Sequence, residues 1–152
     1  AYGGGIRPPE HVARLFAIGV EKAVINTAAF ETDVVTRAAG EHGSQSIVVS
    51  MDVKKDLLGG HEVHVRSGTQ RTRLDPVTYA RRMEAAGAGE LFVNFIDLEG
   101  TQSGYNVAVL AEVAAAVVAS LFRDHFILDL SVQEPAIEEI VRRIYEDNLL
   151  AG

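Results

Sequence analysis

The sequence predicts an α/β protein in which strands and helices alternate along the chain. Short apolar runs at residues 22–25, 46–51 and 91–96 are typical of strands buried in a parallel sheet. A stretch with helical features follows each run, and polar residues gather where the strands end. This alternation indicates a parallel sheet with helical crossovers. Periodicity alone leaves a closed barrel and an open sheet both possible, although polar strand ends are what a barrel requires.

Composition narrows the class of protein further. The 152 residues are 47% hydrophobic and 23% charged, which is enough for one domain with a real core. A net charge of -7 argues against a nucleic-acid partner, because such proteins usually present a basic face. The chain has no cysteine, so we expect no disulfide and take the cytoplasm as the default location. The apolar run at residues 107–122 is broken by Glu112 and is too short to suggest a membrane span.

The first half of the chain predicts two strand-helix units. Residues 1–2 look like the end of a strand, and a glycine triplet turns the chain out of it. A pair of prolines then opens a helix that Gly19 stops. Strand 22–25 is followed by a helix over residues 33–42, and the next strand leads directly to Asp52.

The second half predicts a β-hairpin and a further unit. Alternating residues 62–66, flanked by glycines, indicate a hairpin inserted between strand and helix. Asp75 and Pro76 form a good helix start, with a helix to about residue 86. Strand 91–96 then ends in a polar loop, and a helix from residue 106 to about residue 119 completes the unit.

The C-terminal segment does not continue this series. Residues 126–130 could form a strand but lack a polar loop of the same type. Residues 134–147 predict an amphipathic helix, because their apolar side chains recur at helical spacing. We therefore divide the chain into a barrel-like part, residues 1–118, and a divergent part, residues 119–152.

Asp52 is the first candidate for catalysis. A carboxylate at a strand end in a partly dry cavity can act as a general acid or base. The alternative is an aspartate that caps a helix or fixes a loop.

The glycine triplet at an earlier strand end can present N–H groups to a phosphate, although such triplets also occur as plain turns. Asn26 and Thr27 add side-chain donors nearby, and Gly100 lies in a second loop of this kind.

Other groups of residues give weaker evidence for a functional site. His61 and His64 lie in the predicted hairpin, where a spacing of three places them on opposite faces, so we expect no metal site. Lys22 and Glu90 stand at the amino ends of their strands, where solvated charges are the simplest interpretation. No strand carries a glycine fingerprint followed by an acidic residue at dinucleotide spacing, which weakens a dinucleotide-binding interpretation.

Five segments, in order and with the right spacing, resemble the cyclase subunit of imidazole glycerol phosphate synthase, HisF. The most specific is the Gly-Ser-Gln of residues 43–45 ahead of a strand that ends in Asp52, because it separates this family from the related ribose isomerase of the same pathway. The match covers residues 1–118. Its segments are residues 3–7, 19–29, 43–52, 87–90 and 96–101.

The resemblance implies a partial (β/α)8 TIM barrel, from the third to the sixth strand-helix unit, and a lyase of histidine biosynthesis. Such a subunit takes ammonia from a HisH-type glutaminase and requires no cofactor or metal. It converts a phosphorylated small molecule, a phosphoribulosyl-aminoimidazole carboxamide nucleotide, to imidazole glycerol phosphate.

The resemblance also implies roles for individual residues. Asp52 matches one of two catalytic aspartates, and Lys22 and Glu90 match members of a charged gate for ammonia. The resemblance assigns one phosphate site to Gly4, Gly5, Asn26 and Thr27. It assigns a second group of substrate-facing positions to Asn94, Glu99 and Gly100.

Departures from the family pattern leave alternatives open. Asn94 stands where the histidine-pathway enzymes usually have threonine, and Glu99 where aspartate is common. Asn94, Tyr2 and the loop at residues 54–58 look more like HisF homologues found with surface-polysaccharide genes. Those homologues are thought to deliver ammonia for amidation of a sugar. A non-catalytic module that binds phosphate or docks a glutaminase is a further alternative.

The resemblance accounts for only part of a barrel, since eight units need about 250 residues. The strand that carries the other catalytic aspartate has no match here. We therefore expect this chain alone to be inactive in cyclisation, because acid–base work on two sides of a substrate requires two carboxylates. We also expect self-association through the open edges of the sheet.

Overall fold

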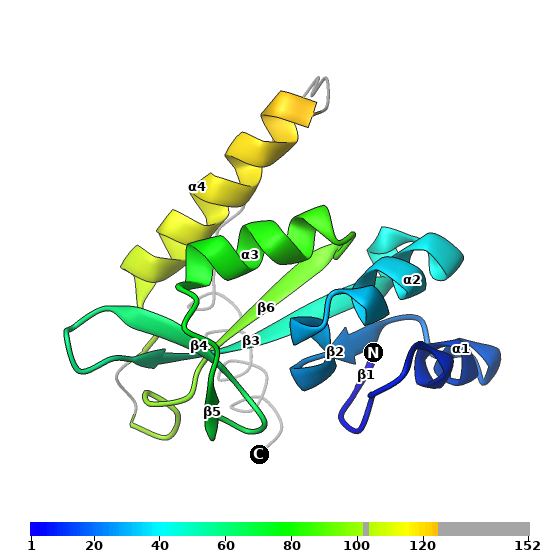
Figure 1. Cartoon of the computed structure of the whole chain (residues 1–152), viewed down its shortest axis with the longest axis horizontal. Coiled ribbons are helices and arrows are strands. Elements are labelled where there is room, and N and C mark those ends of the chain that lie inside the picture. The colour runs from blue at the N-terminus through cyan, green and yellow to red at the C-terminus, as the bar shows by residue number, and fades with distance from the viewer. Residues whose placement is uncertain (102–103, 125–152) are drawn as a thin grey trace, which may run out of the picture.

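The computed structural model describes residues 1–101 and 104–124, and it confirms the predicted α/β class (Figure 1). The strands are β1 (Tyr2–Gly3), β2 (Ala23–Ile25), β3 (Ile47–Lys55), β4 (His61–Val65), β5 (Gln70–Arg71) and β6 (Glu90–Phe95). The helices are α1 (Pro9–Ala17), α2 (Asp33–His42), α3 (Pro76–Ala85) and α4 (Val107–Asp124), with short 3-10 turns η1 (Thr27–Phe30) and η2 (Ser44–Ser46).

The strands form one sheet in which β1, β2, β3 and β6 run parallel. The first half of β3 pairs with β2 on one side, while β6 pairs along the other side over residues 48–53. Beyond Val49 the β4–β5 hairpin takes the place of β2 beside β3. Among the described residues β1 and β6 each have a strand on one side only, so the predicted self-association through these edges stays a prediction.

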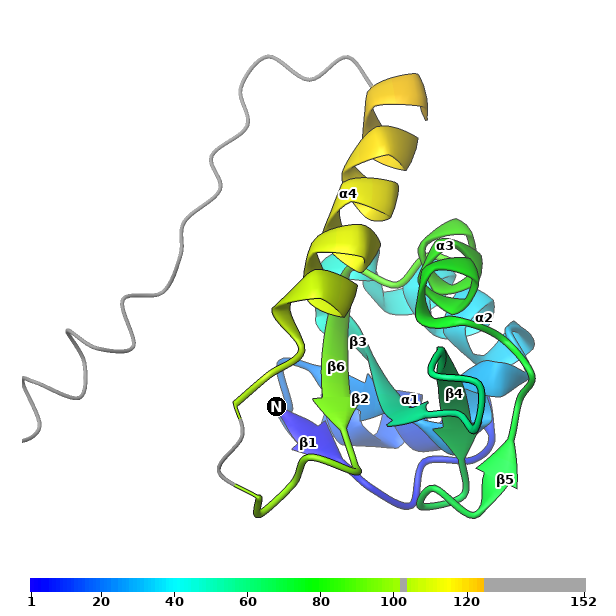
Figure 2. The same cartoon turned by 90° about the vertical axis from the view of Figure 1, so that its left-hand side faces the viewer.

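The core lies between the sheet and the helices, which pack on one face of it (Figure 2). Every second residue of β3 points into this core, because side chains alternate along a strand. Fully buried side chains of the core include Ile25, Ile47, Val49, Met51 and Val53 from the strands and Val12, Val35, Tyr79 and Met83 from the helices. The intervening residues of β3, Val48, Ser50 and Asp52, therefore lie on the opposite face.

The predicted end of the third strand at Asp52 is wrong, because β3 continues to Lys55. The extension forms because the hairpin folds back onto it, with Asp52 opposite His64 and Lys55 opposite His61. The parallel pairing with β6 nevertheless stops at Val53. Asp52 thus lies at the end of the parallel part of the strand, as a barrel site requires.

The start of α3 follows the sequence prediction closely. Asp75 is the N-cap, and its Oδ1 accepts the backbone N–H of Thr78 at 2.9 Å. Pro76 occupies the first turn, where its missing N–H has no intrahelical partner to lose. The predicted bounds of the preceding helix, residues 33–42, also match α2.

Helix α4 is longer than predicted. It runs to Asp124 instead of ending near Ala119. The physical reason is a buried stripe at helical spacing that packs on α3, formed by Val109, Val113, Ala116 and Ser120.

The predicted strand at residues 126–130 and helix at residues 134–147 lie outside the described residues, so the division at residue 118 stays a prediction. In the described part, no helix has both the length and the apolarity needed to cross a bilayer.

Candidate functional site

A cavity of about 900 Å³ opens at the carboxyl ends of the first parallel strands. It lies beside the glycine loop after β1, the polar end of β2 and the β4–β5 turn. Several predicted site residues meet here although they are far apart in the sequence. They are Gly4, Gly5, Asn26, Thr27 and Asp52.

Asp52 lies on the helix-free face of β3 with 8% of its surface exposed. Its neighbour in the register is Asn94 of β6, whose Nδ2 donates a long hydrogen bond of 3.5 Å to Oδ1 of Asp52. The carboxylate therefore faces the cavity with an amide beside it. This geometry suits a group that exchanges protons with a bound molecule.

The polar end of β2 forms a small hydrogen-bond network. The Thr27 hydroxyl lies 3.4 Å from Oδ1 of Asn26, to which it donates, and accepts the backbone N–H of Arg66 at 2.9 Å. Nδ2 of Asn26 in turn lies 3.5 Å from Oγ of Ser50. The network connects β2, β3 and the hairpin at the edge of the cavity.

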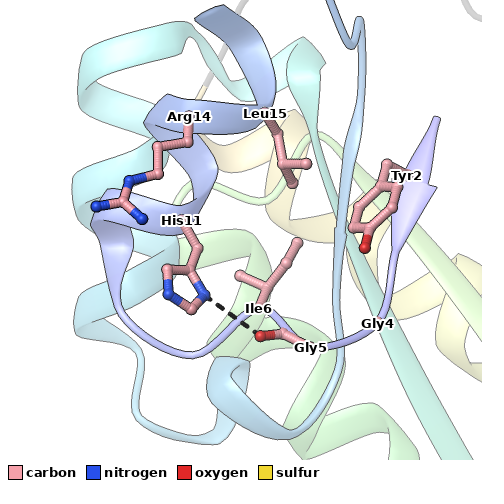
Figure 3. Close-up of a pocket in the computed structure, with 7 residues that line it drawn as sticks. All are labelled: Tyr2, Gly4, Gly5, Ile6, His11, Arg14 and Leu15. Carbon is pink, nitrogen blue, oxygen red and sulfur yellow. Dashed lines mark hydrogen bonds between the residues drawn. The ribbon is translucent and has the colours of Figure 1, made fainter. Parts of the chain in front are cut away.

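Gly4 and Gly5 turn the chain around the cavity with φ angles of 102° and 70°. These angles lie in the left-handed region that glycine adopts at no steric cost. On the other side of this loop, the carbonyl oxygen of Gly5 lies 3.3 Å from Nδ1 of His11, within a smaller hollow of about 260 Å³ beside α1 (Figure 3). The peptide at Gly5 is thus held by α1 while the loop borders the main cavity.

Glu99 and Gly100 lie apart from this group. Both are exposed on the loop that follows β6, and neither lines the cavity that contains Asp52. Gly100 has a φ of 75°, again in the left-handed region. The structure therefore gathers the first set of predicted residues around one cavity and leaves this pair on a separate loop.

Sequence reasoning missed three residues of this region. Ser50 could have been found, because it stands two residues before Asp52 and so shares its face of the strand. Arg7 and Arg66 also line the cavity. No local pattern pointed to Arg66, since its contact with Thr27 joins residues 39 apart in the chain.

Lys22 and Glu90 form an ion pair at the amino end of the sheet, away from Asp52. Lys22 directly precedes β2, Glu90 begins β6, and β3 runs between these strands. Glu90 lies opposite Val48 in the register, so the pair spans β3. Both side chains remain partly exposed, as expected of solvated charges, and the structure adds that they pair with one another.

We expect this ion pair to add little stability. The side chains are 41% and 49% exposed, and exposed pairs contribute at most about 1 kcal/mol. Urea unfolding of Lys22→Gln, Glu90→Gln and the double variant would measure the coupling energy of the pair. A coupling well above about 1 kcal/mol would show that the pair is a structural clamp instead.

Parallel strands, each followed by a helix, with polar side chains and glycine turns at the strand ends, define this chain as part of a TIM barrel. The chain belongs to the family described as histidine biosynthesis protein, whose model matches residues 1–122.

Named relatives make the similarity more specific and support a HisF-like chain. A Pseudomonas aeruginosa protein, provisionally named imidazole glycerol phosphate synthase subunit hisF2, is 43% identical over 117 residues, which is 76% of this chain and 47% of that protein. The HisF subunit of Saccharolobus solfataricus is 42% identical over 116 residues, or 76% and 46% of the two chains. The HisF subunit of Metallosphaera sedula is 38% identical over 156 residues, or 97% and 61%. The first two matches span about half the length of these relatives.

Proposed function

We propose that this chain provides one catalytic carboxylate and one phosphate site of an ammonia-dependent cyclase of the imidazole glycerol phosphate synthase type. The substrate would be a phosphoribulosyl-aminoimidazole carboxamide nucleotide. One observation carries the proposal: Asp52 shares a single cavity with the glycine loop and with the polar end of β2. The carboxylate for acid–base chemistry and the residues that would hold the substrate's phosphate therefore line the same cavity.

Asp52 would act as the general acid or base in this scheme. Only 8% of its surface is exposed, and Asn94 would orient the carboxylate through the 3.5 Å contact. Asn94 can also donate to a substrate oxygen, since its amide carries two N–H donors.

The phosphate would lie against Gly4 and Gly5, where the absence of side chains allows a ligand to approach the backbone. A Cβ added at either glycine would have no neighbour within 4 Å, which is consistent with room for a ligand. Asn26 and Thr27 would add side-chain donors. Glu99 and Gly100, on their separate loop, would serve the opposite end of a substrate that carries two phosphates.

Ammonia would enter at the amino end of the sheet, where Lys22 and Glu90 lie. An exposed ion pair can open at little cost, as a gate requires. The relatives' names describe HisF subunits of a synthase, so a glutaminase partner on this face is part of the proposal.

A ligand titration tests the proposed site on the chain itself. We expect saturable binding of the bisphosphorylated nucleotide, measured by calorimetry, with affinity reduced about tenfold or more in Asn26→Asp, since a carboxylate there would repel phosphate. Asp52→Asn is expected to bind at least as tightly as the original chain, because it removes a negative charge from the same cavity. Absence of binding by the unsubstituted chain would count against the proposal.

The sugar-amidation role rests on the identity of Asn94, which lies beside Asp52 at a position where the resemblance leads us to expect threonine in a histidine-pathway enzyme. A transfer of ammonia to a sugar would need no site for a second phosphate. Equal affinity for a ligand with one phosphate and for the bisphosphorylated nucleotide would favour this second candidate, whereas a clear preference for two phosphates would favour the cyclase.

A further inference from the structure

Two arginines border the cavity from different segments of the chain. Arg7 follows the glycine loop after β1, and Arg66 comes from the turn that joins β4 to β5. Within residues 1–101 and 104–124, neither guanidinium is held in an ion pair. Arg71, in contrast, is paired with Glu62.

The turn that carries Arg66 is held firmly against the site. The backbone N–H of Arg66 donates to Thr27 Oγ1 at 2.9 Å. Its carbonyl oxygen accepts the Thr69 hydroxyl at 2.7 Å, and the carbonyl of Gly68 lies 3.1 Å from Nδ1 of His64. The guanidinium therefore extends from a fixed backbone at the mouth of the cavity.

The backbone of this turn is unusual. Arg66 and Ser67 have φ angles of 53° and 55°, in the left-handed region that residues other than glycine rarely adopt. Such conformations gather at functional sites, where surrounding contacts maintain them. Here the contacts that maintain the turn include Thr27, a residue of the proposed phosphate site.

Acidic as well as basic side chains line the cavity, and both affect the binding of a dianion. Asp52 and Glu31 also line it, so an anion would be repelled unless cations were present. Backbone N–H groups of the glycine loop are neutral donors. Arginine adds charge and a planar fork of donors that matches phosphate geometry.

We propose that Arg66 and Arg7 form a cationic clamp that binds a phosphate monoester dianion above the Gly4–Gly5 loop. This inference rests on the proposed phosphate site and adds its principal source of charge. Arg66 would provide the larger share, because its backbone is fixed through Thr27, whereas Arg7 has no hydrogen bond of this kind among those identified in the described part of the chain.

Calorimetric titration of the 152-residue chain with ribose 5-phosphate and with inorganic phosphate tests the clamp. We expect Arg66→Asn to weaken binding of ribose 5-phosphate about tenfold or more, because a charge-assisted hydrogen bond is lost. Asparagine tolerates the left-handed conformation, so this variant should keep its fold, and its urea unfolding curve serves as the check. Arg66→Lys should retain part of the affinity, and Arg7→Gln should cause a smaller loss. Arg81→Gln, on the exposed surface of α3, is the matched control and should bind like the original chain.

The outcomes separate the clamp from the phosphate site. Binding that falls in Asn26→Asp but stays unchanged in folded Arg66→Asn and Arg7→Gln would overturn the clamp and leave the proposed site standing. Loss in Arg66→Asn with recovery in Arg66→Lys supports the clamp. Equal weakening by Arg81→Gln would indicate a nonspecific charge effect and overturn it. No binding of either ligand by the unsubstituted chain would overturn both proposals.

Discussion

Replacing Gly89 by alanine is expected to lower the free energy of unfolding by about 3 kcal/mol, the upper part of the range for overpacking. A Cβ at this position would lie 2.1 Å from the carbonyl oxygen of Ser44 and 2.9 Å from the backbone nitrogen of Gln45. Both neighbours are backbone atoms, so no side-chain rotation can relieve the overlap. The loops that enter β3 and β6 would have to separate, although the Gly89 N–H donates to the Ile47 carbonyl at 3.1 Å.

Gly40→Ala is the matched control for this substitution. Gly40 lies inside α2, and a Cβ there would meet nothing within 4 Å. Alanine is favoured over glycine in a helix, so the control should raise stability by about 0.5–1 kcal/mol. Urea unfolding followed by circular dichroism measures both variants. A Gly89→Ala chain as stable as the original would show that the two loops are not packed as described.

Glu62→Gln is expected to lower the free energy of unfolding by about 1–2 kcal/mol at neutral pH, the scale of hydrogen bonds to a charged group after screening. Glu62 is 5% exposed, and its oxygens accept the Arg71 Nε–H at 2.8 Å and the Arg73 backbone N–H at 2.6 Å. Glutamine can still accept from Arg73, but its amide would place donors against the guanidinium. The hairpin would then lose a side-chain bond that joins β4 to β5 in addition to their backbone pairing.

The stabilisation by Glu62 should depend on pH. The hydrogen bond from Arg71 lowers the pKa of Glu62 below its ordinary value of 4.5, so the folded chain binds fewer protons at this site than the unfolded chain. The contribution is therefore fully present above pH 4.5 and is lost as the pH falls through the lower folded pKa. We expect the stability difference between the original chain and Glu62→Gln to shrink over that acid range. Glu21→Gln, on an exposed loop, should show almost no difference at any pH, and a pH-independent effect at Glu62 would contradict the assignment.

Elements with strong local signals could be predicted from the sequence. The N-cap Asp75 and the following proline define the start of α3 through contacts within a few residues. Helix α2 ends at His42, because the next residue, Gly43, takes a φ of 85° and stops the helix locally. In contrast, the extension of β3 to Lys55 and of α4 to Asp124 depends on partners elsewhere, the hairpin and α3. Propensity could not supply those boundaries, because tertiary packing decides them.

In the candidate site too, some residues could be predicted from local sequence features, while others depend on contacts between distant parts of the chain. Asp52, Gly5 and Asn26 could be identified from the sequence, because strand ends and glycine turns are local features that a barrel fold places together. Arg66 could not, since only the folding of the hairpin over the end of β2 brings its backbone to Thr27. The long-range contact has no signature in the residues around either position.

The sequence by itself determined the order of the strand-helix units and the position of Lys22 and Glu90 at the amino ends of their strands. Local hydrogen bonding and hydrophobic periodicity are sufficient for both. Only the tertiary structure decided that Lys22 and Glu90 pair across β3 and that two arginines border the Asp52 cavity. Both depend on the register between strands and on the path of a hairpin, which are set by packing among residues distant in the chain.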